Sequence, residues 1–491
     1  MKSKICLLLA FIISGLASPA KDYKASFFGI ESNGTTLNTR SIQKAIDYIH
    51  DNGGGRLVFY VGRYLTGTIY LKSDVTIQLE EGAILVGSTN PFDYDRHGYW
   101  TSLIFAFDEQ NIGITGKGVI DGQGYKVANK ILSMVHRGVI KDPNDLLYDR
   151  PREGIRPQNI YFKGCRNVTI SGILLKDPAS WNQQYDQCKN VLIENITVDS
   201  KSYWNNDGVD IVDCDSVIVR NSYFDAADDG ICLKSHSADH VCQNVFIHNN
   251  TVRTSANGIK FGTASNGGFK NIRIINNTVF DTYRSAITFA AVDGGFVENI
   301  EVDSLKSLHT GNVIFLRIGE RKPGKKGRME NISIKNVYAE VPATKPDAGY
   351  NYEGPVEDLP RNISPAAIVG MPDDAIKNVR LENIEIHYPG GGNPLYAKVG
   401  LDELDQVPEL PEKYPEFSMF KELPAWGFYI RHAEDIKFKN VKLICEKEDY
   451  RTAIVLDDVQ GAFFKSLDVE EPGTGKQKVF SYKSGNVVLD E

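Results

Sequence analysis

Residues 190–198 read NVLIENITV, an asparagine followed by alternating apolar residues, then a second asparagine and another short apolar run. Alternation of apolar and polar residues over so few positions is typical of a β-strand with one buried face. Asparagine is common where a chain turns, because its side chain bonds nearby backbone groups and it tolerates a left-handed backbone. This stretch therefore predicts short strands separated by a tight polar turn.

The same pattern recurs along most of the chain. Successive copies lie about 22 to 32 residues apart, with the longer spacings at loop insertions, which is the signature of a parallel β-helix. Short strands with no helical stretches between them exclude a βαβ fold, and the asparagines are interpreted as structural ladders. The copies are NIGITG at Asn111, NVTISGI at Asn167, NVLIENITV at Asn190, DSVIVRNSYF at Asp215, NVFIHNNTV at Asn244, NIRIINNTV at Asn271, NIEVDSL at Asn299, NISIKNVYA at Asn331, NVRLENIEI at Asn378 and DIKFKNVKL at Asp435.

A helix is predicted before the first strands, because Ile42, Ala45, Ile46 and Ile49 have helical spacing and Asn38 can cap its start. With one apolar face, it should lie across the open end of the solenoid, where an uncovered coil would expose strand edges. The strands expected after it are 57–60, 68–71, 75–79 and 83–86.

Two longer insertions interrupt the repeat, at residues 341–373 and 388–426, within what is otherwise predicted to be a single domain, residues 21–491. Loops of that length are either walls of a binding site or excursions from the fold. Their aromatic residues either stack on sugar rings or pack the loops onto the solenoid. These are Tyr350, Tyr352, Tyr396, Tyr414, Phe417, Phe420 and Trp426.

The first 20 residues have the composition of a secretory signal peptide. Lys2 and Lys4 precede an apolar run, residues 5–16, and cleavage is expected near Ala20. The run is too short for a membrane span, and no other stretch is long and apolar enough to be one. We therefore expect a protein that is exported to the periplasm or outside the cell. We also expect it to be a monomer.

The net charge of −8 argues against a nucleic acid partner, and an acidic glycan would need local cations to bind. Most of the six cysteines after the leader are expected to be buried as small apolar side chains. A single bridge between Cys232 and Cys242 stays open, since the two are close in sequence and the compartment is oxidising. No cysteine and histidine group has the spacing of a zinc site.

The chemistry is concentrated between Tyr203 and Ser235, in YWNNDGVDIVDCDSVIVRNSYFDAADDGICLKS. Asp207 lies about one coil before the pair Asp228 and Asp229, so these carboxylates are expected to face one groove, together with that of Asp210. A single aspartate often only bonds a turn. Clustered carboxylates repel one another and raise the pKa of one member, as acid–base cleavage of a glycosidic bond requires.

These residues resemble glycoside hydrolase family 28, the polygalacturonase family, which includes rhamnogalacturonase-like pectin hydrolases. The resemblance covers nearly the whole mature chain. It implies a right-handed parallel β-helix of the pectin-lyase-like type with an N-terminal helical cap. It also implies inverting hydrolysis of O-glycosidic bonds in a pectic polysaccharide or oligosaccharide, without metal or organic cofactor. The segments that carry it are residues 38–88, GKGVIDGQG at Gly116, RPQNIYFKGCRNVTISGI at Arg156, NNDGVDI at Asn205 and DDGICLKS at Asp228.

The resemblance assigns roles to three carboxylates. The family's Asn-Thr-Asp-Gly motif matches at Asn205 and Asp207, with Asn206 in place of the threonine, and its Asp-Asp pair matches Asp228 and Asp229. By this resemblance Asp228 is the general acid that protonates the leaving oxygen. Asp207 and Asp229 hold and deprotonate the attacking water.

Two other motifs of the family are missing. Asn257 stands where the family has the histidine of Gly-His-Gly, and the positions of its Arg-x-Lys pair, around 288–290, carry no cation. Because a buried carboxylate without a partner is costly, this loss favours a rhamnogalacturonan-type or neutral-sugar linkage over plain polygalacturonate. Lys234 and Lys260 are the expected replacement cations, and His236 is a further candidate for the cleft.

Later coils carry more cations, for which an ordinary surface role is the competing interpretation. These are Arg284, Arg317 and Arg321.

Two other functions remain alternatives. A polysaccharide lyase on the same fold would need a calcium cluster or an Arg or Lys base beside substrate-neutralising cations, and a non-catalytic solenoid would only bind glycan.

Overall fold

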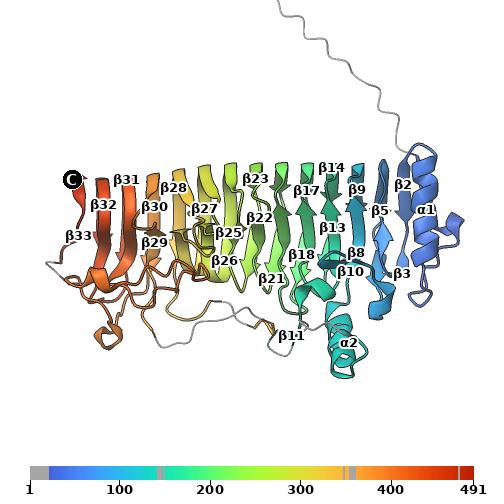
Figure 1. The fold of residues 1–491 in the computed structure, drawn as a ribbon, viewed down its shortest axis with the longest axis horizontal. Helices are drawn as coiled ribbons and strands as arrows, with labels where there is room; N and C mark the ends of the chain where they lie inside the picture. The colour runs from blue at the N-terminus through green and yellow to red at the C-terminus, as the bar shows by residue number, and fades with distance from the viewer. Residues whose placement is uncertain are drawn as a thin grey trace, which may run out of the picture.

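The computed structural model describes residues 21–140, 146–147, 150–346, 349–352, 361–473 and 476–490. The expected signal peptide lies outside these residues. The described chain coils into a long solenoid of parallel strands (Figure 1). The predicted all-β class and parallel β-helix are confirmed.

Each coil places its strands in three parallel ladders, and from β26 onward one long strand spans more than one ladder. The first ladder contains β1 (Asp22–Lys24), β2 (Gly55–Phe59), β5 (Val75–Leu79), β9 (Gln110–Gly116), β14 (Arg166–Ser171), β17 (Lys189–Glu194), β20 (Asp215–Arg220) and β23 (Cys242–His248). The second contains β3 (Gly62–Thr66), β6 (Ala83–Gly87), β10 (Val119–Asp121), β15 (Leu174–Lys176), β18 (Thr197–Ser200), β21 (Tyr223–Ala226) and β24 (Thr251–Thr254).

The third ladder carries the predicted catalytic stretch. It contains β4 (Ile69–Tyr70), β8 (Trp100–Phe107), β13 (Gln158–Lys163), β16 (Gln183–Asp186), β19 (Val209–Val212), β22 (Ile231–Ser235), β25 (Ile259–Ser265), β29 (Ala366–Val369) and β33 (Val479–Tyr482). The remaining long strands and the last strand are β26 (Phe269–Ala291), β27 (Phe296–Ile318), β28 (Arg328–Glu340), β30 (Ile376–Tyr388), β31 (Ala425–Cys445), β32 (Thr452–Glu470) and β34 (Gly485–Asp490). Among the described strands, β7 (Arg96–His97) pairs antiparallel with β8, and β11 (Leu146–Leu147) pairs antiparallel with β12 (Arg150–Pro151).

The predicted helix is α1 (Thr39–Asp51), which covers the N-terminal end of the solenoid (Figure 1). Its apolar face is buried as expected, at Ile42, Ala45, Ile46 and Ile49. Asn38 precedes the helix, but its side chain does not cap it; its Oδ1 accepts from the Glu31 N–H at 2.9 Å. The carboxamide therefore ties the helix to the preceding loop.

The prediction of no helices between strands was wrong at α2 (Gly124–His136), which buries Val127, Ala128 and Ile131. It projects from the same long edge of the solenoid as the loops of the two insertions (Figure 1). The part of the chain that the structure describes also contains five short 3-10 helices, at Ala25–Phe28, Pro91–Asp93, Glu153–Ile155, Pro394–Tyr396 and Leu404–Gln406.

Asparagine ladders run along the outside of the turns, as predicted. Asn190 Nδ2 donates to Asn167 Oδ1 at 3.1 Å, and Asn167 Nδ2 donates to Asn111 Oδ1 at 2.9 Å. These asparagines have positive φ angles, between 53° and 56°. Each turn therefore uses asparagine both for its left-handed backbone and for the bond to the next coil.

Inside the coils, stacked isoleucine, valine, leucine and phenylalanine side chains form one continuous core. The six described cysteines are buried and unbridged, so the bridge between Cys232 and Cys242 does not form. Most of them act as the small buried apolar side chains that the sequence predicted. None of the described helices is long and apolar enough to span a membrane.

The predicted insertions need two corrections. Strand β29 lies inside the first predicted range, so the described excursion ends before Ala366. Trp426 belongs to β31 and is buried in the core, where its ring packs edge-on against Tyr388. The second excursion therefore runs from the end of β30 to the start of β31.

Candidate active site

Two stacked turns bring the predicted carboxylates together. Asp207 lies in the turn between β18 and β19, and Asp228 and Asp229 lie in the turn between β21 and β22. β19 pairs with β22 in parallel register, and the Gly208 N–H donates to the Asp229 carbonyl at 2.9 Å. A Cβ at Gly208 would lie 2.4 Å from the Gly230 carbonyl oxygen, so glycine is what lets the two turns approach.

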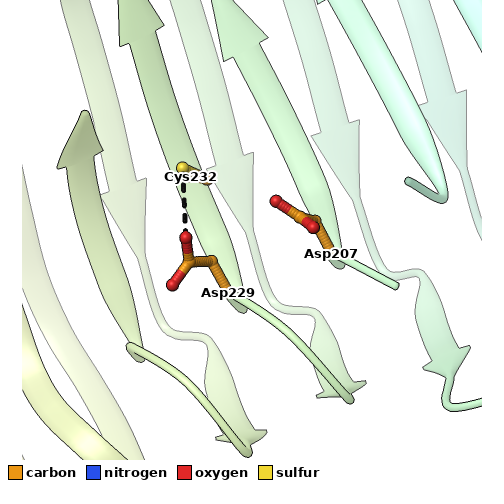
Figure 2. Close-up of side chains that lie close together, drawn as sticks. All are labelled: Asp207, Asp229 and Cys232. Atoms are coloured by element: carbon orange, nitrogen blue, oxygen red, sulfur yellow. Dashed lines mark hydrogen bonds between the residues drawn. The ribbon is translucent and has the colours of Figure 1, made fainter. Parts of the chain in front are cut away.

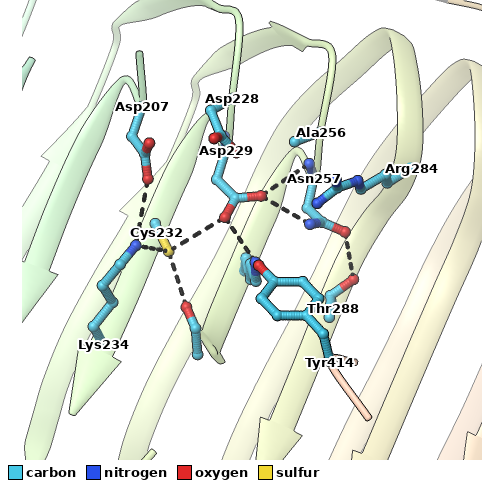
Figure 3. A network of polar contacts seen from close by, with 12 residues as sticks. Asp207, Asp228, Asp229, Cys232, Lys234, Ala256, Asn257, Arg284, Thr288 and Tyr414 are labelled. Atoms are coloured by element: carbon cyan, nitrogen blue, oxygen red, sulfur yellow. Dashed lines mark hydrogen bonds and ion pairs between the residues drawn. The ribbon is translucent and has the colours of Figure 1, made fainter. Parts of the chain in front are cut away.

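Asp229 is the most strongly anchored of these carboxylates (Figure 3). Its Oδ1 accepts from Asn257 through both the backbone N–H, at 3.1 Å, and Nδ2, at 2.8 Å. Its Oδ2 pairs with Lys260 Nζ at 2.8 Å. Burial favours the neutral acid, but Lys260, Lys234 and Arg284 outweigh it and hold the pKa of Asp229 below its usual range. Asp229 is therefore ionised.

Asp207 and Asp210 share one cation. Lys234 Nζ lies 2.6 Å from Asp210 Oδ1 and 3.3 Å from Asp207 Oδ2, and all three side chains are buried. Burial and the charge of Asp210 raise the pKa of Asp207. Burial raises the pKa of Asp210 to about 6, against the pull of Lys234. One ammonium therefore serves two carboxylates, and the pair takes up a proton more readily than an exposed aspartate does.

Asp228 faces a cavity and is only half-buried. Its Oδ1 accepts from the Asp229 N–H at 3.0 Å, and its carbonyl accepts from the Thr254 hydroxyl. Burial and the neighbouring charge of Asp229 raise the pKa of Asp228. The two adjacent aspartates thus differ in the way that acid and base partners do, with the pKa of one raised and that of the other lowered.

Asp207, Asp229 and Cys232 present oxygen and sulfur atoms that all lie within 4.8 Å of one another (Figure 2). Lys234 Nζ is 2.9 Å from Cys232 Sγ and also contacts Asp207, while Lys260 contacts Asp229. The two ammonium groups already supply this cluster with positive charge.

The second insertion completes the site. Tyr414 OH accepts from Lys260 Nζ at 2.6 Å, and Glu416 Oε1 pairs with Arg284 Nη1 at 2.6 Å. Between these contacts and Asp228 lies a cavity of about 380 Å³. It is lined by Asn205, Asp228, Tyr283, Arg284, Lys413, Tyr414, Glu416, Phe417, Ser418 and Met419. The insertion aromatics serve different uses. Tyr414 lines the cavity, where a sugar ring could stack on it, whereas Phe420 is buried and packs the loop onto the solenoid.

Asn205 also lines this cavity, and a buried arginine holds it there. Arg156 is fully buried and donates to the Trp204 carbonyl at 2.6 Å and to Asn205 Oδ1 at 2.8 Å. Its guanidinium also bonds carbonyls of residues 151, 152 and 179. Arg156 therefore fixes the turn that leads to Asp207, a role that its place in the quoted RPQNIYF segment did not reveal.

The first insertion reaches the same turn from another side. The Tyr352 ring lies 5.0 Å from that of Tyr203 and 5.8 Å from that of Trp204, and Tyr350 OH donates to Asp225 Oδ1 at 2.6 Å. Both tyrosines thus pack their loop onto the solenoid.

The structure does not bring all predicted residues to the site. His236 is exposed, and its backbone N–H donates to Asp213 Oδ2 at 3.2 Å, so its ring stays outside the network described above. Arg317 is buried and donates to the Glu409 carbonyl at 2.5 Å, which ties down the second insertion. Arg321 pairs with Asp293 at 2.8 Å. Arg284, one of the later-coil cations, is buried and lines the cavity. Glu416 was not selected from the sequence.

Asn257 connects Asp229 to the next coil, because its Oδ1 accepts from the Thr288 hydroxyl at 2.8 Å. Hydrogen bonds to charged groups contribute about 1.5–3 kcal/mol, so we expect Asn257→Ala to lower kcat about 10- to 100-fold while the backbone N–H still holds Asp229. Steady-state kinetics would measure this. The exposed ladder variant Asn244→Ala is the control; an Asn257→Ala enzyme with the same kcat as this control would exclude the positioning role.

Comparisons with known proteins identify relatives of this chain. Residues 59–336 match the model of the glycosyl hydrolases family 28. An exo-poly-alpha-D-galacturonosidase of Dickeya chrysanthemi is 28% identical over 318 residues, which cover 55% of this chain and 52% of that protein, about half its length. A probable polygalacturonase of Vitis vinifera is 24% identical over 422 residues, covering 78% of this chain and 77% of that protein.

Solved structures share the fold. The family 28 exopolygalacturonase of Yersinia enterocolitica superimposes with a TM-score of 0.60 at 20% identity, covering 96% of this chain and 79% of that one. An exopolygalacturonase from Thermotoga maritima gives 0.57 at 23% identity, covering 75% and 87%.

Proposed function

Because the chain belongs to glycoside hydrolase family 28, we propose that it is a polygalacturonase-like enzyme that hydrolyses O-glycosidic bonds in a pectic glycan by an inverting mechanism. The observation that carries the proposal is the group of three carboxylates on two stacked turns beside one cavity. Asp228 lines this cavity, and oxygens of Asp207 and Asp229 lie within 4.8 Å of each other behind it.

Asp228 is the general acid in this proposal. It is the member of the group that lines the cavity, and its raised pKa favours the protonated form that a leaving glycosidic oxygen needs. It keeps solvent contact, so it can regain a proton after each turnover. Because the leaving oxygen is protonated, the leaving sugar departs as an alcohol and not as an alkoxide.

Asp229 and Asp207 hold and activate the water. Two hydrogen bonds of ordinary length through one oxygen span up to about 5 Å, so one water can bridge oxygens of Asp207 and Asp229, which lie within 4.8 Å of each other. Asp207 Oδ1 is buried and has no partner among the described residues, which leaves it able to accept such a bond. Because Asp229 stays ionised while Asp207 shares Lys234 with Asp210, Asp229 is the base that removes the proton.

Separation of the roles supports inversion. The water is held by two carboxylates and Asp228 serves the leaving group, so water attacks the anomeric carbon directly and no carboxylate forms a covalent intermediate. The proton lost by water goes to Asp229, and that of Asp228 goes to the leaving sugar. No step requires a metal or organic cofactor.

Product analysis tests this proposal. Purified protein should release saturated sugars from polygalacturonate, rhamnogalacturonan or oligosaccharides that end in galactose, rhamnose or galacturonate. Unsaturated products that absorb in the ultraviolet would identify a lyase and contradict the three-carboxylate mechanism. Glycan binding without cleavage across this panel would identify a non-catalytic solenoid.

The proposal includes export of a monomer across the inner membrane. Residues 1–20 have the charged start, apolar run and small residues of a cleaved leader, and pectic glycans are found outside cells. N-terminal sequencing of protein from the periplasm or medium should begin near residue 21. An intact Met1 on exported protein would contradict cleavage.

A further inference from the structure

Glu416 is a carboxylate that the second insertion, and not the solenoid, brings into the cavity beside Asp228. Its side chain is 19% exposed, and its Oε1 lies 2.6 Å from Nη1 of Arg284, whose side chain is 5% exposed. This contact joins the insertion to β26 at the wall of the cavity. The guanidinium is thereby engaged by a carboxylate of the protein itself.

The other cations of the site are engaged as well. Lys260 bonds Asp229 and Tyr414, and Lys234 bonds Asp207 and Asp210. Lys413 also lines the cavity, but its side chain is exposed, so solvent screens its charge.

Strand β26 carries no cation at the positions that match the family's Arg-x-Lys pair. Thr288 is buried and its hydroxyl donates to Asn257, and Ala290 is buried and apolar. A sugar carboxylate entering the cavity would therefore meet the Glu416 carboxylate, which already occupies Arg284, while Asp228 as the protonated acid offers it no cation.

We propose that Glu416 is a specificity-determining residue, which makes this cavity accept an uncharged sugar residue and disfavours a uronate. The inference rests on the proposed hydrolase function and specifies the sugar residue that lies in the cavity. Hydroxyl groups suit the pair, because a carboxylate accepts their hydrogen bonds and a guanidinium donates to their oxygens. A uronate carboxylate would compete with Glu416 for Arg284 and would repel the Glu416 carboxylate. Unfavourable like-charge contacts are a common basis of specificity.

Glu416→Gln is the test, because the amide keeps the shape of the side chain, removes its charge and leaves Arg284 able to bind a carboxylate. The probes are a short oligogalacturonate and two oligosaccharides in which one residue next to the scissile bond is galactose or rhamnose. For each enzyme the readout is the ratio of kcat/KM between neutral-sugar and all-uronate substrates. This ratio is unaffected by the fraction of folded enzyme.

We expect the wild-type enzyme to prefer a neutral-sugar substrate by roughly tenfold or more, the scale of one like-charge contact, and Glu416→Gln to reduce this preference to near one. The matched control is Glu412→Gln, the same change at an exposed position four residues earlier in the insertion. It should keep the wild-type ratio.

The pH dependence of the ratio is a second readout. Burial raises the pKa of Glu416 to about 7. The positive charges of Arg284 and Lys260 lower this pKa, and the negative charges of Asp229 and Asp228 raise it. Lys413 and Tyr414 of the insertion line the same cavity. The wild-type preference should therefore weaken as the pH falls below about 7, because protonated Glu416 resembles glutamine. The ratio for Glu416→Gln should change less over the same range.

An unchanged ratio in Glu416→Gln, or a wild-type preference for the all-uronate substrate, would overturn this inference and leave the proposed hydrolase function intact. Cleavage of none of the probes by the wild-type enzyme would overturn both.

Discussion

Replacement of Asp228 by asparagine is expected to lower kcat by about 10²- to 10⁴-fold, the usual contribution of a general acid. The amide keeps the size of the side chain and can still accept from the Asp229 N–H, as Asp228 Oδ1 does at 3.0 Å. It has no proton to give to the leaving oxygen. Initial rates on the substrate that the wild-type enzyme cleaves fastest measure the effect.

A leaving group that needs no proton separates this role from a structural one. An aryl glycoside with an acidic phenol should be cleaved by Asp228→Asn at a rate much nearer that of the wild-type enzyme. The exposed variant Asp239→Asn serves as the control and should keep full activity. If Asp228→Asn loses both substrates equally, or retains more than about a tenth of kcat, Asp228 is not the acid.

Replacement of Lys260 by methionine is expected to affect stability more than any other change considered for this protein. Lys260 is 1% exposed and its partner Asp229 is 3% exposed, so the variant leaves a buried carboxylate without its cation. Breaking a buried pair in this way costs about 3–5 kcal/mol in the free energy of unfolding. Lys439→Met, which breaks an exposed pair with Glu382, should cost about 1 kcal/mol or less.

The pH dependence of this loss follows from the lowered pKa of Asp229. A carboxyl whose pKa is lower in the folded than in the unfolded protein stabilises the fold above its unfolded pKa, and the stabilisation disappears as the pH falls through the folded pKa. Without Lys260 the pKa of Asp229 rises. The difference between Lys260→Met and the wild-type enzyme should therefore be largest near neutral pH and shrink in acid.

The same variant should move the acidic limb of the activity profile to higher pH, because Asp229 would take up a proton sooner and cease to act as a base. Denaturant unfolding at several pH values and the pH profile of kcat/KM measure the two effects. A variant as stable as Lys439→Met, with an unshifted acidic limb, would show that Lys260 does not keep Asp229 ionised.

The fold could be predicted because it repeats. Each coil buries the same apolar positions and places asparagine at the same turn, so the spacing of Asn167, Asn190 and Asp215 alone indicates the stacking. Helix α2 was not predicted because it does not repeat along the chain, although Val127, Ala128, Ile131 and Val135 have helical spacing. The side-chain bond that Asn38 makes with Glu31 depends on a local loop that no periodicity describes.

The candidate site could be predicted where it follows the register of the coils. Asp207, Asp229 and Lys260 come from neighbouring coils, and their meeting follows from stacking about one repeat apart. Tyr414 and Glu416 come from an irregular insertion. Lys260 and Tyr414 are 154 residues apart in sequence, and only the path of the loop decides that they touch. Solvent exposure, which sequence spacing cannot predict, likewise kept His236 outside the network.

Inversion at the anomeric carbon follows directly from a water activated by Asp229 and Asp207 while Asp228 serves the leaving group. Proton NMR of the first product formed, recorded before mutarotation, reads the configuration of the new reducing end. We predict the configuration opposite to that of the cleaved bond. A product that retains the configuration would mean that a carboxylate had attacked the sugar, and it would contradict the roles assigned to Asp207, Asp228 and Asp229.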